Sequence, residues 1–192
     1  NMDRNSPEYL IEESPESAAK ATVEWILNSL KRYKRVYPIL TPRFIPTCSD
    51  ELMENLKEIQ KRYNLALQSH LSEAQGEIQW VKELCPEAEF YGDAYDRFGL
   101  FGREVKTVMA HCVSSSYEEL MRIKDNGVYI AHCPQSNVNL ASGIAPVRTF
   151  IQEGLKVGLG SDVAGGSTES IFTAMADAIH VSKLRWVLID KN

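Results

Sequence analysis

The sequence predicts an α/β fold built on a parallel sheet. Short apolar runs alternate with segments whose apolar residues recur at helical spacing, and Asn, Gly or Pro stand at the boundaries. Strands alternating with helices indicate βαβ units, in which parallel strands are buried on both faces. Five strands are expected, at residues 36–41, 65–70, 107–113, 128–133 and 156–161.

Two architectures accommodate this alternation. An open doubly wound sheet of five strands would be complete within 192 residues, whereas an eight-stranded β/α barrel usually needs ~250 residues. Length alone therefore favours the open sheet. The placing of polar residues favours the barrel, because several strands carry a titratable residue near their C-terminal end, where β/α barrels have their sites.

Helices are expected between the strands. Ser116 and Glu119 form a capping-box pattern, and Ser72 with Gln75 forms another, so each serine should begin a helix. Residues 85–106 interrupt the alternation and should form a loop with a short helix. The expected helices are residues 15–33, 49–63, 72–84, 116–125, 145–153 and 169–183.

Composition narrows the possible partners and compartments. The net charge is −5 and the basic residues are scattered, so no nucleic acid partner is expected. No apolar run approaches the ~20 residues of a membrane helix, and no signal peptide or membrane anchor is recognisable. Four cysteines without CxxC spacing suit free thiols in a reducing compartment, so a cytoplasmic protein is expected: Cys48, Cys85, Cys112 and Cys133.

Three of the four histidines lie in the C-terminal half of a predicted strand, and an aspartate ends a fourth strand. Each residue alone could be structural, since a single His in an apolar strand is more often a satisfied core residue than a ligand. Together they indicate a metal site, because His and carboxylate are the ligands of zinc and iron. The residues are His70, His111, His132 and Asp162.

Strand alternation separates these histidines from the neighbouring cysteines. If His111 and His132 point to the interior of a barrel, then Cys112 and Cys133 point outward and are not ligands. His180 lies on the expected helix of residues 169–183 and is interpreted as a structural or surface residue.

Glu73 has two interpretations of equal weight. As the residue after Ser72 it would lie in the first helical turn, where the helix dipole favours an acid. As an unattached acid near a metal site it would be a general acid and base. Arg43 and Phe44 suggest a substrate, because an Arg fork matches the O6/N7 edge of guanine and a Phe ring stacks on a flat heterocycle. A salt-bridged Arg and a core Phe are the simpler alternative.

The chain resembles the amidohydrolase superfamily in five motifs: TPRF, QSHLSE, VMAHC, IAHCPQSN and GLGSDVAGG, which lie in order within residues 41–166. The resemblance implies a (β/α)8 barrel with one divalent metal, zinc or iron. It also implies roles: His70 and Asp162 as metal ligands, Glu73 as proton shuttle, His111 as holder of the water, Arg43 and Phe44 as substrate-binding residues, and His132 and Asn137 as supporting residues.

The implied reaction is hydrolytic deamination of guanine to xanthine and ammonia by metal-activated water, in a homodimeric enzyme. Two alternatives remain. The parent protein could be an aminohydrolase or chlorohydrolase of the same superfamily acting on another heterocycle, or a barrel homologue that has lost catalysis and serves as a scaffold.

One departure from the family pattern limits this interpretation. The family's HxH pair on the first barrel strand is absent from residues 1–192. We therefore expect a C-terminal portion of the barrel, strands 4 to 8 with their helices, cut out of a longer chain. With two of four ligands, such a portion alone should bind metal weakly and show no turnover.

Overall fold

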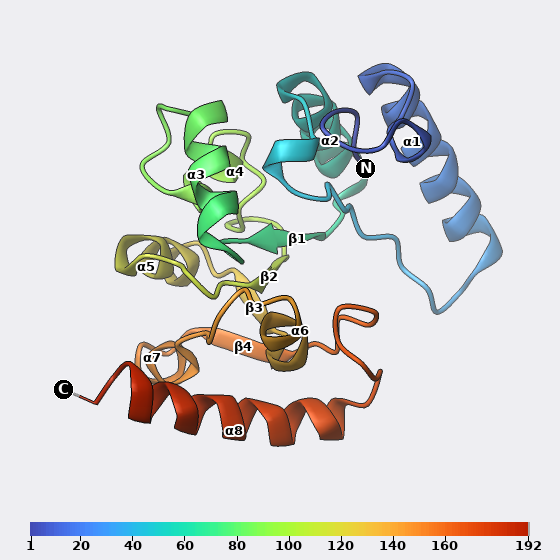
Figure 1. Ribbon diagram of the computed structural model, residues 1–192. Coiled ribbons are helices and arrows are strands. Elements are labelled where there is room, and N and C mark those ends of the chain that lie inside the picture. Colours follow the sequence, from blue (N-terminus) through green and yellow to red (C-terminus); the bar gives the residue numbers. More distant parts are fainter. Residues whose placement is uncertain (192) are drawn as a thin grey trace.

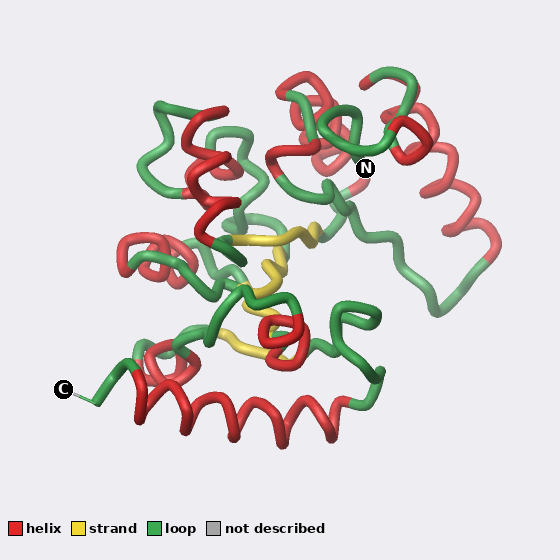
Figure 2. Tube along the Cα trace, viewed as in Figure 1, coloured by secondary structure: helices red, strands yellow, loops and turns green. Residues whose placement is uncertain are grey.

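The computed structural model describes residues 1–191 and confirms an α/β fold. Its sheet has four parallel strands: β1 (Leu67–Leu71), β2 (Thr107–His111), β3 (Tyr129–His132) and β4 (Lys156–Leu159). The spatial order β1-β2-β3-β4 repeats the order along the chain. The strands form a curved arc with helices on its outside (Figures 1 and 2).

The expected strand at residues 36–41 is not formed, which corrects the sequence-based prediction. Only Leu40 pairs with the sheet, through a parallel bridge to Leu67. Its N–H donates to the Ala66 carbonyl at 2.9 Å, and its carbonyl accepts from Gln68 N–H at 2.9 Å. Pro38 and Pro42 have no N–H to donate, so the ladder cannot extend in either direction.

The helices largely follow the prediction. One short helix, α6, was not expected, because its sequence PQSNVN has no amphipathic period. The helices are α1 (Pro15–Arg32), α2 (Asp50–Tyr63), α3 (Gln75–Leu84), α4 (Tyr91–Asp96), α5 (Tyr117–Asp125), α6 (Pro134–Asn139), α7 (Val147–Gln152) and α8 (Ile171–Leu188), with 3-10 turns at Glu8–Leu10 and Ile45–Thr47. Within residues 1–191 no helix is long and apolar enough to cross a membrane.

The expected cap at Ser72 is wrong. Helix α3 begins after Ala74, without a side-chain cap. Ser72 has φ +45°, a left-handed conformation, whereas an N-cap residue needs an extended backbone. Its hydroxyl donates instead to Oε2 of Glu119 at 2.7 Å. A tertiary contact with a buried carboxylate therefore replaces the local one.

Glu119 joins three segments of the core. It is 1% exposed, and its Oε1 accepts a second hydrogen bond from the N–H of Gly92 at 2.6 Å. Its own N–H is capped by the Ser116 hydroxyl at 3.2 Å, as the capping-box pattern predicts. Burial raises the pKa of this carboxyl. Glu119 thus ties the loop after β1 to the starts of α4 and α5.

Asn64 ends α2 in the left-handed conformation, with φ +50°. Asn64→Ala should lower the free energy of unfolding by about 1 kcal/mol, because a Cβ without a compensating polar group disfavours this conformation. Urea denaturation followed by circular dichroism measures the change. Asn64→Gly is the matched control and should stay within about 0.5 kcal/mol of the wild type. Equal losses in both variants would contradict this explanation.

Candidate active site

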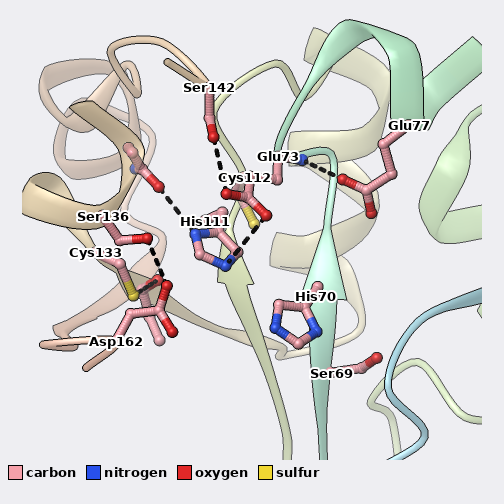
Figure 3. A network of polar contacts seen from close by, with 12 residues as sticks. Ser69, His70, Glu73, Glu77, His111, Cys112, Cys133, Ser136, Ser142 and Asp162 are labelled. Carbon is pink, nitrogen blue, oxygen red and sulfur yellow. Dashed lines mark hydrogen bonds and ion pairs between the residues drawn. The ribbon is translucent and has the colours of Figure 1, made fainter. Parts of the chain in front are cut away.

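Two histidine rings lie together at the C-terminal ends of neighbouring strands. His70 on β1 and His111 on β2 stack with ring centroids 5.4 Å apart and an interplanar angle of 12° (Figure 3). His70 Nδ1 lies 2.6 Å from the carbonyl oxygen of Arg43. Since a carbonyl only accepts, Nδ1 carries a proton, and in the neutral tautomer of this ring the lone pair is on Nε2.

A sharp turn of the backbone orients His111. It has φ +75° and Cys112 has φ +50°, so two successive non-glycine residues adopt a left-handed conformation directly at the strand end. The Oδ1 of Asn137 lies 2.9 Å from His111 Nδ1, which holds that nitrogen as the donor. His111 Nε2 then lies 3.6 Å from Oε2 of Glu73.

Glu73 follows β1 by two residues, and two hydrogen bonds fix it. Its Oε1 accepts from the Ser142 hydroxyl at 2.8 Å, and its N–H donates to Oε2 of Glu77 at 3.3 Å (Figure 3). Glu77 is fixed in turn by the Tyr91 hydroxyl, which donates to Oε1 at 2.7 Å. Burial raises the pKa of the Glu77 carboxyl. Glu73 is therefore fixed by one hydrogen bond from its backbone N–H and one to its carboxylate.

Asp162 lies beyond β4 at φ +47°. Its Oδ2 accepts from the Ser136 hydroxyl at 2.5 Å. Gly165 permits this close approach, because a Cβ there would lie 2.6 Å from the Ser136 Oγ and 2.9 Å from Oδ2 of Asp162. Gly165, within the GLGSDVAGG motif, is thus needed for the packing around Asp162.

A cavity of about 260 Å³ opens beside Glu73 and His70. The rings of Phe44 and Trp80 pack edge to face, with their centroids 6.2 Å apart. The Arg43 guanidinium lies 5.2 Å from the Phe44 ring centroid. Arg43 and Phe44 thus lie beside His70 and Glu73, and their role in substrate binding stays a prediction. The cavity is lined by Arg43, Phe44, His70, Glu73, Gly76, Glu77 and Trp80.

Glu77 and Trp80 were not predicted as site residues. They lie three residues apart on α3, at the spacing of one helix face, and this face was the available signal. Without knowledge of which face of α3 meets the strand ends, the spacing alone could not select them.

His132 and Asn137 differ in their surroundings. Asn137 supports His111 directly, while both ring nitrogens of His132 are buried without a hydrogen-bond partner in residues 1–191. Burial, with the nearby His111, lowers the pKa of His132 to about 4, so this imidazole is neutral. His180 is exposed on α8, as expected. The four cysteines are free and buried.

The expected metal ligands come from the two outer strands of the sheet. His70 belongs to β1, Asp162 follows β4, and within residues 1–191 no group of three or more His, Cys, Asp or Glu could hold a metal ion. The free Nε2 of His70 and the Asp162 carboxylate have the donor chemistry that zinc or iron requires. They fit two ligands of such a site.

A parallel sheet with His and acidic side chains at its C-terminal strand ends defines a β/α protein with a hydrolase-like site. The profile of the amidohydrolase family matches residues 1–192, and the chain belongs to this family.

Within this family, the chain is similar to several guanine deaminases. A probable guanine deaminase of Schizosaccharomyces pombe is 41% identical over 99% of the chain, and the guanine deaminase of Homo sapiens is 42% identical over 99%. The structure of guanine deaminase from C. acetobutylicum with bound guanine matches 97% of the chain with 49% identity and a TM-score of 0.94. The chain spans 36%, 41% and 44% of these three proteins, respectively.

Proposed function

We propose that residues 1–192 belong to a longer polypeptide that hydrolyses guanine to xanthine and ammonia. The observation that carries the proposal is the placing of Glu73: its carboxylate lies 3.6 Å from the His111 ring and lines a cavity with Arg43 and Phe44. Glu73 can carry a proton, the Arg43 guanidinium offers paired hydrogen-bond donors, and the Phe44 ring offers a flat apolar face. The high similarity to a structure with guanine in its active site supports this substrate.

The barrel assignment is part of the proposal. We infer that β1 to β4 are strands 5 to 8 of a (β/α)8 barrel and that residues 36–41 take the place of strand 4. Residues 1–192 would then be the C-terminal portion of the catalytic barrel, with strands 1 to 3 and their HxH pair in the rest of the polypeptide. The consecutive parallel order of the strands supports this assignment, since barrel strands follow one another in this way.

His70 and Asp162 would hold a divalent ion, zinc or iron, together with two ligands from the rest of the polypeptide. Such an ion, when bound, makes water a stronger nucleophile near neutral pH. The proton of His70 on Nδ1, held by the Arg43 carbonyl, keeps Nε2 available for this purpose. Asn137 fixes the ring of His111. His132 is buried and would be an uncharged supporting residue.

The remaining residues bind guanine and move protons. Arg43 would donate to O6 and N7, and Phe44 would cover one face of the purine. Asp162 and His111 would orient the attacking water toward the carbon that carries the amine. Glu73 would take one proton from this water through Oε2 and pass it to the adjacent ring nitrogen. It would then take the second proton from the newly added hydroxyl group and give it to the amino group, which leaves as ammonia when the C–N bond breaks.

A guanine assay of the full-length polypeptide with added zinc tests this function. Loss of the ultraviolet absorbance of guanine with release of ammonia is the expected result. Arg43→Ala should raise KM for guanine roughly 10- to 100-fold, the effect of losing one bidentate contact to a base edge. Arg62→Ala, an exposed change on α2, is the control and should leave KM unchanged.

Two outcomes would contradict the proposal. An inert guanine with turnover of another aminated or chlorinated heterocycle would indicate a different hydrolase of the family. Metal-loaded protein that turns over no such compound would favour a non-catalytic scaffold.

A further inference from the structure

The C-terminal end of α6 turns the chain back toward the site. The N–H of Ser142 donates to the Asn137 carbonyl at 2.9 Å, and the N–H of Ala141 donates to the Val138 carbonyl at 3.1 Å. Ala141 has φ +56°. These two bonds and the left-handed residue constitute a Schellman motif, which ends a helix by backbone contacts alone. The position of Ser142 is therefore set without its side chain.

The Ser142 hydroxyl is thus free to bind elsewhere, and it donates to Oε1 of Glu73 at 2.8 Å, across 69 residues of sequence (Figure 3). The same helix end holds the other partner, since the Asn137 side chain contacts His111 at 2.9 Å. Glu73 and His111 approach each other at 3.6 Å. The four residues form a closed ring of contacts, in which one helix end braces side chains from the ends of two strands.

We propose that Ser142 is a positioning residue for guanine deamination and acts through Glu73. This inference rests on the proposed function. A hydroxyl has one proton to donate, so its bond to Oε1 distinguishes the two carboxylate oxygens. Oε1 is held, and Oε2 is left facing His111 as the atom that exchanges protons. Without the hydroxyl, the carboxylate can rotate about its terminal bond, and the oxygen nearest the substrate loses its fixed place.

Ser142→Ala in the full-length, metal-loaded protein should lower kcat for guanine roughly tenfold, the lower end of the range for losing an outer supporting contact. KM should stay within about twofold, because Ser142 does not line the substrate cavity. Ser142→Thr keeps a hydroxyl and should recover most of kcat. Ala141→Gly changes the neighbouring residue of the same turn and should leave kcat unchanged, since glycine favours φ above zero.

A double-mutant cycle separates action through Glu73 from a general effect on the fold. In a Glu73→Gln background, Ser142→Ala should cause no further loss of kcat, because the group that it positions is gone. A full tenfold loss in that background, or a normal kcat for Ser142→Ala alone, would overturn the inference while the wild type still turns over guanine. Absence of guanine turnover by the wild type would instead refute the proposed function, and this inference with it.

Discussion

If the full-length protein hydrolyses guanine as proposed, Glu73→Gln should lower kcat by about a thousandfold, within the range attributed to a general acid and base. The amide is nearly the same size as the carboxylate but cannot accept and return a proton. It still offers an oxygen to the Ser142 hydroxyl, which lies 2.8 Å from Oε1. KM should therefore change by less than about threefold. Steady-state kinetics with guanine measure both parameters.

Glu83→Gln is the matched control for this substitution. Glu83 is an exposed carboxylate near the end of α3, and its contact is with Gln79 on the same helix. The same chemical change there should leave kcat and KM as they are. A Glu73→Gln protein that keeps more than about a tenth of the wild-type kcat would show that another group carries the proton.

Glu119→Ala should lower the free energy of unfolding by about 3 kcal/mol, because two buried donors lose their acceptor at once. These donors are the Ser72 hydroxyl, at 2.7 Å, and the Gly92 N–H, at 2.6 Å. The shortened side chain also leaves a void in a core where Glu119 is 1% exposed. Urea denaturation at about pH 5 measures the loss, and a change below about 1 kcal/mol would contradict the assigned contacts.

Glu119→Gln keeps the shape of the side chain but removes its titratable carboxyl group. Burial raises the pKa of Glu119 above its ordinary 4.5, so the folded protein keeps this proton at a pH where the unfolded chain has lost it. Stability from the wild-type carboxyl is thus fully present below 4.5 and declines as pH rises toward the folded value. The amide does not titrate, so the stability of wild type relative to Glu119→Gln should fall over this interval. A difference that is constant with pH would contradict the raised pKa.

The alternation of apolar strands and amphipathic helices was enough to predict the α/β class and four of the strands. The strand expected at residues 36–41 is not formed because Pro38 and the adjacent Pro42 limit the ladder to Leu40, which strand propensity does not register. The cap at Ser72 failed because its hydroxyl binds Glu119, 47 residues away. Helix α6 was missed because six residues without amphipathic spacing give no periodic signal.

The sequence could predict those candidate site residues whose positions depend on the direction of the strands. His70, His111 and Asp162 lie at or beyond the C-terminal strand ends, and parallel pairing brings such ends to one edge. Ser142 and Trp80 were not predictable, because their positions depend on a turn geometry and a helix rotation set by tertiary packing. The motifs predicted His70, Glu73, His111 and Asp162 as candidate site residues, and the structure adds Ser142 and Glu77, which contact Glu73.

The sheet order also determines when the site can exist during synthesis. Neighbouring strands pair at separations of 40, 21 and 27 residues, as in Leu67 with Thr107, Val108 with Tyr129, and Tyr129 with Lys156. Each strand therefore pairs with a strand that was synthesised before it. His70 and Glu73 emerge before His111, Ser142 follows α6, and Asp162 comes last. A chain that ends before β4 would contain His70, Glu73, His111 and Ser142 but lack Asp162, so the last of these groups is added together with the last strand of this sheet.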